Sequence, residues 1–260
     1  MPAPKPKFQS LSVQIGEAIA HLRLVRPALG NRFDETGHSE FAAALDLLAS
    51  SEETRVVILS AEGRHFSAGG DFEDIVAAGQ SEIIRARMSR VASLLFHRLV
   101  ALPMPVIAAV QGAAIGLGAT IVSLCDITVA FRDAKIGDPH VQLGIVAGDG
   151  GIIGWSQSVG MNRAKRYLLT GDYLTAGEAH AMGLITDLAN SPEEVLPKCM
   201  EIAQRLVALP RGGVEGTKRA FLRLTQQTAL TAFDVGLAYE MQSMTSPDVA
   251  ATVEKLKRPR

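Results

Sequence analysis

One stretch, residues 106–118 (VIAAVQGAAIGLG), constrains most strongly how this chain can fold. Its first five residues are an uninterrupted apolar run, typical of a strand buried on both faces, and Pro103 and Pro105 prevent a helix from running into it. Gly112, Gly116 and Gly118 then turn the chain into an apolar segment that is expected to begin a helix. Such a junction points free backbone N–H groups at the positive end of a helix dipole, which is half of an anion site. On spacing alone, the glycines can equally serve only close helix–strand packing.

Length and composition bound the class of protein. The 260 residues, 47% of them apolar, suffice for one large core, and the formal net charge of −1 provides no global field for nucleic acid or an anionic membrane. Cys125 and Cys199 are far apart and belong to no Cys/His cluster, so we predict neither a disulfide framework nor a metal site. The first ten residues lack the apolar core of a signal peptide, and no apolar run reaches membrane-spanning length. We expect a cytoplasmic protein.

The hydrophobic pattern predicts strands that alternate with helices over residues 1–190, which we interpret as a mixed α/β core that contains the active site. The predicted strands are a hairpin at 11–24 and single strands at 56–59, 106–110, 127–131 and 184–188. The predicted helices are 33–50, one capped by Asp71, 81–102, 119–124 and helices through 182. Residues 191–260 show only helical pattern, at 193–208, 212–225 and 229–244. This second region either packs on a neighbouring subunit or covers its own domain.

Several short motifs follow one another in a specific order and spacing. They are RP…N at 26–31, FSAGGD at 66–71, PVIAAVQGxxxGxG at 105–118, CDI at 125–127, GxxxGDGG at 144–151 and LLTGDYLTAGEAHAMGLI at 168–185. As a set, and over nearly the full length, they resemble the crotonase, or enoyl-CoA hydratase/isomerase, superfamily. The resemblance implies a spiral of ββα units, a C-terminal helical region that forms a homotrimer or homohexamer and closes the active site, and a coenzyme A thioester as ligand, with no other cofactor.

The resemblance also implies a site in which two backbone N–H groups hold the thioester oxygen. These map to Ala68 and to Leu117, where the family usually has glycine. Fixed N–H donors stabilise the negative charge that develops on that oxygen without having to reorganise. The remaining residues implied to bind substrate are Gly69, Gly70, Asp71 and Gly116 from the two glycine loops and, by position, the cations Arg26 and Lys218. Either cation can instead be a solvated surface residue.

Two departures from the family pattern affect the chemistry. Enoyl-CoA hydratases carry two glutamates whose positions are occupied here by Thr120 and His140, so their two-glutamate hydration cannot be transferred to this chain. Thr120 lies in the predicted substrate region, although its hydroxyl can simply bond to the preceding helical turn. Trp155, close to the same region, is either a core residue or a wall of the acyl pocket.

His140 is the candidate that replaces the missing carboxylates. Histidine titrates near neutrality, and Asp149, nine residues on, can fix its tautomer and raise its basicity. Asp149 can instead merely cap the following helix, and Asp138, next to Pro139, is interpreted as a structural N-cap. The other histidines, at 21, 38, 65, 97 and 180, are interpreted as structural.

This His/Asp spacing resembles the superfamily branch that cleaves β-diketones. The segment GLAYE at 236–240 is similar to a motif of that branch and adds Glu240 as a catalytic candidate, although a helical glutamate is more often exposed. That branch has a further histidine where this chain has Leu117. We therefore expect an acyl-CoA enzyme that catalyses hydration, isomerisation or hydrolysis, with a β-dicarbonyl C–C hydrolase and a catalytically silent acyl-CoA-binding protein as alternatives.

Overall fold

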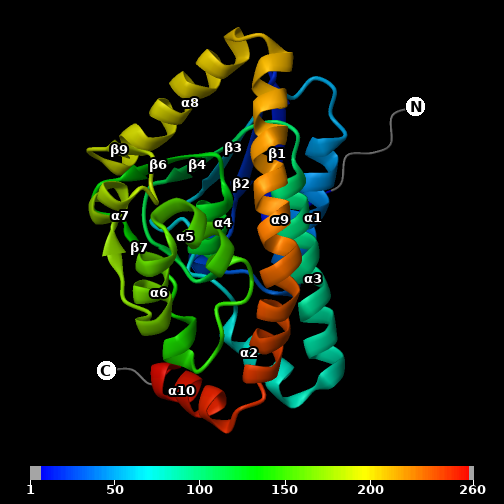
Figure 1. Ribbon diagram of the computed structural model, residues 1–260, viewed down its shortest axis with the longest axis vertical. Helices are drawn as coiled ribbons and strands as arrows, with labels where there is room; N and C mark the ends of the chain where they lie inside the picture. Colours follow the sequence, from blue (N-terminus) through cyan, green and yellow to red (C-terminus); the bar gives the residue numbers. More distant parts are fainter. Residues whose placement is uncertain (1–6, 258–260) are drawn as a thin grey trace.

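The computed structural model describes residues 7–257, and its centre is one six-stranded sheet (Figure 1). The strand order is β1-β2-β3-β4-β6-β9, and only the β1–β2 hairpin is antiparallel. The strands are β1 (Leu11–Gly16), β2 (Ile19–Leu24), β3 (Val56–Ala61), β4 (Val106–Val110), β6 (Ile127–Phe131) and β9 (Asp187–Ala189). Since the strands from β2 onward are parallel, their carboxyl ends meet at one edge, where open α/β sheets place ligands.

A small second sheet, which the sequence did not predict, gathers the loops at that edge. It consists of β5 (Ala114–Ile115), β7 (Lys135–Gly137) and β8 (Leu174–Thr175) in the order β5-β7-β8. The Gly116 N–H donates to the Gly137 carbonyl at 2.9 Å, and a parallel bridge joins Ser67 to Ala114. The loops that follow β3, β4 and β6 are thereby held against one another.

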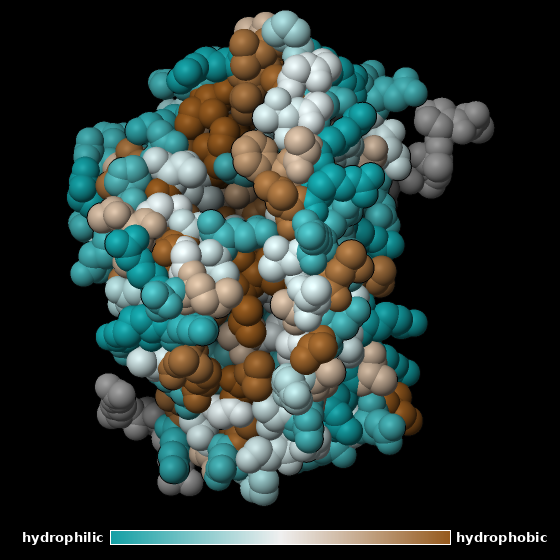
Figure 2. Space-filling view, in the orientation of Figure 1, coloured by the Kyte–Doolittle hydropathy of each residue, from teal (hydrophilic) through white to brown (hydrophobic). Residues whose placement is uncertain are grey.

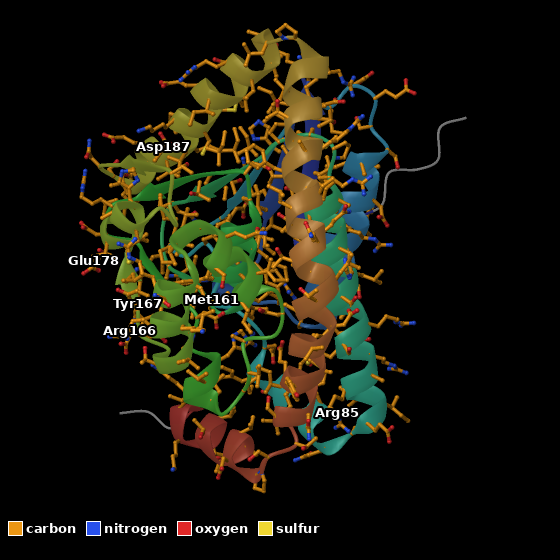
Figure 3. All side chains as sticks on the ribbon, viewed as in Figure 1. Arg85, Met161, Arg166, Tyr167, Glu178 and Asp187 are labelled. Carbon is orange, nitrogen blue, oxygen red and sulfur yellow. The ribbon has the colours of Figure 1, made fainter. Side chains whose placement is uncertain are left out.

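Helices surround the main sheet, and one of them, α2, begins at a predicted cap. They are η1 (Pro27–Leu29), α1 (Glu35–Ala49), α2 (Phe72–Gln80), α3 (Glu82–Ala101), α4 (Leu117–Leu124), η2 (His140–Leu143), α5 (Gly151–Val159), α6 (Met161–Thr170), α7 (Ala176–Met182), α8 (Pro192–Ala208), α9 (Arg211–Ser243) and α10 (Pro247–Lys257). Asp71 caps α2 by accepting from the Glu73 N–H at 2.8 Å, and Arg85 of α3 donates to the Ala78 carbonyl of α2, fixing the corner between these helices (Figure 3).

Two predicted boundaries were wrong. The segments 212–225 and 229–244 form the single helix α9, because no glycine or proline separates them. The strand expected at 184–188 starts only at Asp187, since Gly183 ends α7 in a left-handed conformation and Leu184 and Ile185 turn into the core. Thr186 then ties this segment to β6 through two 2.8 Å hydrogen bonds with Thr128.

The C-terminal helices divide their contacts. In α9, the half nearest its C-terminus packs with α10 against α2 and α3, where Phe233 stacks on Phe96 with ring centroids 4.0 Å apart. The half nearest its N-terminus instead leaves large apolar side chains exposed, and an apolar patch lies over α8 and this part of α9 (Figure 2). No helix within residues 7–257 combines the length and apolar content needed to cross a bilayer.

Candidate active site

The start of α4 supplies backbone N–H groups to the carboxyl edge of the sheet. Gly116 precedes the helix with φ 54° and ψ −124°, a conformation that a side chain would strain, as the sequence predicted. Its own N–H is used by Gly137, whereas the N–H groups of Leu117 and Gly118 have no acceptor among the described residues. These two donors are therefore free to bind an anionic oxygen.

The second expected donor, Ala68, is not available. Its N–H donates to the Gly30 carbonyl at 2.8 Å, so the prediction that it shares an oxygen with Leu117 is not met. Two residues on, the Gly70 N–H has no acceptor among the described residues. Gly69 packs against the other glycine loop, since a Cβ atom there would lie 2.8 Å from the Ile115 carbonyl oxygen.

His140 lies beside this glycine junction, at the start of η2. Its Nδ1 bonds to the carboxylate of Asp138, and its Nε2 is 3.9 Å from Asp149 Oδ2. The carboxylate that is hydrogen-bonded to the imidazole is thus Asp138, whereas Asp149 forms an ion pair with it at 3.9 Å instead of the predicted hydrogen bond. Asp138 is 2% exposed, which a solvent-facing cap would not be. In the sequence, this contact is indicated only by the position of Asp138 two residues before His140, because short acidic side chains often bond to groups nearby in the chain.

Asp149 and Thr120 form the floor of the site. The Thr120 hydroxyl donates to Asp149 Oδ1 at 2.9 Å instead of bonding to its own helix, which corrects the expected contact with the preceding turn. The same oxygen accepts from the Gly151 N–H at 3.3 Å. Asp149 therefore helps to hold the start of α5 while its other oxygen faces His140.

Glu240 completes the cluster from α9. It is only 5% exposed, so the solvent-facing interpretation was wrong, and its Oε2 has no hydrogen-bond partner among the described residues. The close approach depends on Gly148 and Gly236, whose backbones touch: a Cβ atom at Gly236 would lie 3.5 Å from Gly148. A helix face alone does not reveal such an approach, so the sequence pattern could not place this carboxyl group.

Burial controls the protonation of the cluster. Desolvation, followed by the charge of Asp149, raises the pKa of Glu240 well above its ordinary value, and desolvation also raises the pKa of Asp149. Burial alone would lower the pKa of His140, but the Asp138 and Asp149 carboxylates raise it well above its ordinary value. These shifts favour the imidazolium form of His140 and the protonated form of the Glu240 carboxyl group.

Asp138, His140 and Asp149 each place one ligand-type atom within 4.8 Å of the others. Asp138 is hydrogen-bonded to the imidazole Nδ1, and Asp149 accepts a hydrogen bond from Thr120, so these groups already have partners. We therefore interpret the group as a proton-sharing network.

Two cavities meet at His140. The outer one, of about 240 Å³, is bordered by both glycine loops and by Tyr173, Thr252 and Leu256. The inner one, of about 40 Å³, is bordered by Leu117, Asp149 and Glu240. His140, Gly70 and Ile75 line both. The imidazole is thus in reach of atoms placed in either cavity.

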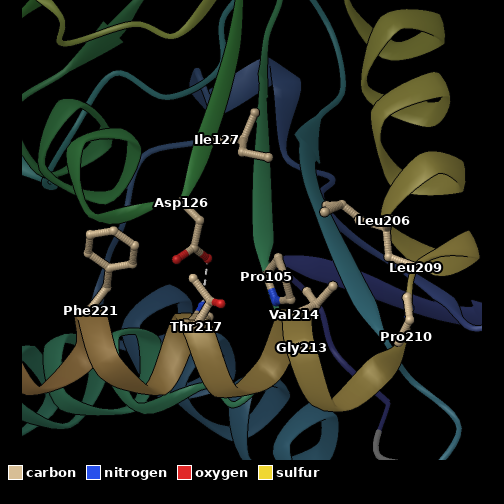
Figure 4. Close-up of a pocket in the computed structure, with 11 residues that line it drawn as sticks. Pro105, Asp126, Ile127, Leu206, Leu209, Pro210, Gly213, Val214, Thr217 and Phe221 are labelled. Carbon is tan, nitrogen blue, oxygen red and sulfur yellow. Dashed lines mark hydrogen bonds and ion pairs between the residues drawn. The ribbon is translucent and has the colours of Figure 1, made fainter.

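Other candidates lie elsewhere or have structural partners. Lys218 donates to Asp126 at 2.6 Å and to the Met104 carbonyl. Both partners lie next to the first residues of β4 and β6, and therefore at the edge of the sheet opposite to the site; Figure 4 shows Asp126 there. Arg26 holds Asp34 through two hydrogen bonds of 2.6 and 2.8 Å. Trp155 is fully buried in the core and borders neither cavity at His140.

Comparison with known proteins agrees with the fold and the loop geometry. Residues 14–258 match the family described as enoyl-CoA hydratase/isomerase. The chain is 31% identical over 248 residues to the 2,3-dehydroadipyl-CoA hydratase of Escherichia coli, covering 95% of this chain and 93% of that protein.

Solved structures give the same result. An enoyl-CoA hydratase/isomerase from Mycobacterium paratuberculosis is similar with a TM-score of 0.90 and 32% identity, covering 95% of this chain and 98% of that one. A β-diketone hydrolase from Anabaena is similar with a TM-score of 0.85 and 26% identity, covering 94% and 98%. The fold and the site define a crotonase-superfamily protein. More closely, the chain belongs to the enoyl-CoA hydratase/isomerase family, whose members act on acyl-CoA thioesters.

The buried Glu240 predicts a pH-dependent stability. Its raised pKa means that the folded protein binds the proton more tightly than the unfolded chain, so this contribution is complete below about pH 4.5 and is lost as the pH rises through the folded pKa. Each unit of difference is worth about 1.4 kcal/mol, or roughly 2–4 °C. We expect the melting temperature of Glu240→Gln to fall less steeply between pH 5 and 9 than that of the wild type. Glu254→Gln, at an exposed position of α10, is the control. Parallel curves for Glu240→Gln and the wild type would contradict the prediction.

The two aspartates next to His140 are expected to differ. Asp138→Asn removes the carboxylate charge beside His140 Nδ1 and should lower kcat roughly ten- to hundredfold. It should also shift the histidine-dependent limb of the pH–rate profile to lower pH. Asp149→Asn keeps the contact with Thr120 but removes the carboxylate that faces Nε2, and it should lower kcat by roughly a hundred- to ten-thousandfold if that carboxylate takes a proton during the reaction. If Asp149 acts only as a cap, asparagine should be nearly neutral in both rate and stability. An unchanged pH profile in Asp138→Asn would remove its positioning role.

Proposed function

We propose that this protein is an acyl-CoA hydratase, which adds water to a 2-enoyl thioester or removes it from the 3-hydroxy product. One observation carries the proposal: His140 borders both the cavity of the glycine junction and the inner cavity that contains Asp149 and Glu240. A carbonyl oxygen bound at the start of α4 would place the adjacent carbons next to the imidazole. The coenzyme A portion arrives with the substrate and is not a separate cofactor.

The proposed step uses residues already in contact. The thioester oxygen accepts from the Leu117 N–H; the other free N–H groups belong to Gly118, in the first turn of α4, and to Gly70, in the loop before α2. Water in the inner cavity, which has room for such a molecule, attacks the β-carbon and gives a proton to Asp149. The α-carbon of the enolate takes a proton from the His140 imidazolium. The proton on Asp149 then returns to His140 across the 3.9 Å between them, which restores the site.

A substrate panel in isotopically heavy water tests the reaction. Enoyl-, 3-hydroxyacyl- and β-ketoacyl-CoAs are incubated in D₂¹⁸O, and the products are analysed by mass spectrometry. Hydration places heavy oxygen on the β-carbon and deuterium on the α-carbon. Isomerisation introduces deuterium only, and thioester hydrolysis places the oxygen in a carboxylate. Binding of all thioesters without turnover of any would support the silent alternative and contradict the proposal.

A second candidate is C–C hydrolysis of a β-dicarbonyl compound. It is favoured by Glu240, whose raised pKa favours the protonated form that can donate to a second carbonyl group, and by the similarity to the Anabaena β-diketone hydrolase. Water then attacks the ketone, and the thioester enolate leaves. Cleavage of the β-ketoacyl-CoA in the same panel, with heavy oxygen in the released acid, would favour this candidate over hydration.

We further propose a trimer or a dimer of trimers. Apolar side chains line a cavity of about 680 Å³ between the ends of α8 and α9 and the sheet, including Leu209, Val214 and Phe221 (Figure 4). Phe221 is 65% exposed, and a contiguous patch of this kind marks an interface. We also propose a cytoplasmic location.

Light scattering at micromolar concentration should therefore give at least three times the mass of one chain. Phe221→Asp should shift the protein towards smaller species, because a charge at the interface must be desolvated. Ile83→Asp, an equally exposed apolar position at the start of α3, should leave the mass unchanged. A wild-type protein that is monomeric under these conditions would contradict the assembly.

A further inference from the structure

The inner cavity has a mixed lining that proton transfer alone does not explain. Its apolar wall combines flexible and rigid side chains, namely Phe33, Ile75, Met88, Ala92, Leu117, Met241 and Met244. Its polar groups, apart from the cluster at His140, are His38, Asp71 and Asp74. Asp71 is occupied, since it caps α2 and pairs with Arg32 at 2.6 Å. A ligand in this cavity therefore meets His38 and Asp74 on the side of α1 and α2.

The inner cavity is the place for the acyl group. Coenzyme A is large and charged, and the outer cavity is the larger of the two. The inner cavity continues beyond the start of α4, and its walls are formed by buried groups such as Met241 and Met244. At about 40 Å³ it holds only a few non-hydrogen atoms, so a long alkyl chain does not fit without displacing the methionines.

His38 lines this cavity, and its ring carries a hydrogen-bond acceptor. Its Nδ1 contacts the Asp34 carbonyl at 2.9 Å, and since a carbonyl oxygen only accepts, Nδ1 carries the hydrogen and Nε2 carries the lone pair. Burial lowers the pKa of this imidazole, so the ring stays neutral. No described residue donates to Nε2, although His38 is only 9% exposed. The interpretation of His38 as merely structural therefore leaves one acceptor without a partner.

We propose that the inner cavity selects a short acyl group that carries a hydroxyl group, and that His38 accepts the hydrogen bond from that hydroxyl. This inference rests on the proposed function because it assigns the acyl end of the same substrate. A plain alkyl group would leave the acceptor desolvated and unpaired, and sites of this kind discriminate against substrates that lack the matching polar group. The half-buried carboxyl group of Asp74 lines the same side of the cavity and disfavours an anionic acyl end.

Binding of non-reacting thioesters tests the inference without requiring turnover. Calorimetry is carried out with coenzyme A and with butanoyl-, 4-hydroxybutanoyl- and octanoyl-CoA. We expect 4-hydroxybutanoyl-CoA to bind about tenfold more tightly than butanoyl-CoA, and octanoyl-CoA to bind at least tenfold more weakly than butanoyl-CoA. Equal affinities for the two four-carbon thioesters would overturn the hydroxyl assignment, and tight octanoyl-CoA binding would overturn the size limit.

Variants assign the effects to residues. His38→Phe keeps an aromatic ring beside Phe33 but has no acceptor, and it should remove the hydroxyl preference, so that the two four-carbon thioesters bind with equal affinity. His38→Gln retains an acceptor and should keep part of the preference. Met244→Ala should improve octanoyl-CoA binding, whereas Met161→Ala, at an exposed position on α6 (Figure 3), should not. A preference that persists in His38→Phe, with unchanged melting temperature, would refute the role of His38.

The same experiment separates the two proposals. If neither coenzyme A nor any thioester binds, the proposed function fails. If all thioesters bind without discrimination, only the inference about the acyl group fails.

Discussion

His140→Ala should lower kcat by roughly a hundred- to ten-thousandfold, which is the usual size of general acid–base catalysis. The imidazole is the group that borders both cavities, and Asp138 on its Nδ1 keeps it protonated and oriented. Affinity for coenzyme A should change little, because the imidazole is one of many groups that line the outer cavity, which also include both glycine loops, the neighbours of His140 in η2 and two residues of α10.

The measurement is steady-state kinetics on the substrate that the isotope panel identifies, with coenzyme A binding followed by calorimetry. His180→Ala is the matched control, since His180 lies on α7 and borders neither cavity. Turnover within threefold of the wild type in His140→Ala would exclude this residue from the chemistry and leave Asp149 and Glu240 as the proton-transfer groups to be tested.

Gly116→Ala is expected to lower kcat/KM by roughly a hundred- to thousandfold. The residue has φ 54°, where an alanine costs about 1–3 kcal/mol, and its side chain would point towards His140, with the Cβ 3.7 Å from the ring Cε1. Relief of this strain turns the peptide that carries the Leu117 N–H, and the loss of one such donor has an effect of this size.

Kinetics and thermal unfolding are to be measured together for this variant. Gly16→Ala is the control, because a Cβ atom at that exposed position at the end of β1 meets nothing within 4 Å. A Gly116→Ala protein with full activity would mean that the start of α4 does not hold the reacting oxygen.

The sequence predicted the elements whose pattern is strong and local. The strand β4 was found at its observed bounds, because five apolar residues between a proline pair and a glycine turn have few alternatives. The Asp71 cap and the helix expected at 193–208, which is observed as α8 from Pro192 to Ala208, were found for the same reason. By contrast, β5, β7 and β8 have only two or three residues each, too few for any periodicity to be detected.

The site was predicted only in part, because its decisive contacts join distant segments. Nothing near Ala68 indicates that the Gly30 carbonyl takes its N–H. Asp138 has the local pattern of a cap, and only the folded loop shows that it bonds to His140. Glu240 has the sequence pattern of an ordinary helical glutamate, and only the contact between Gly148 and Gly236 brings α9 close enough to place it in the site.

The 33 residues of α9 are about 50 Å of continuous helix. In its N-terminal part, Lys218 is hydrogen-bonded to Asp126, and Phe221 is exposed on the apolar surface. Near its C-terminal end, Glu240 belongs to the proton-sharing network. A straight helix transmits a tilt at one end to the other as a rod does. A neighbouring subunit that packs on Phe221 would therefore also fix the position of Glu240, which it does not contact. Subunit dissociation would then displace this proton donor, and activity would be lost before the chain unfolds.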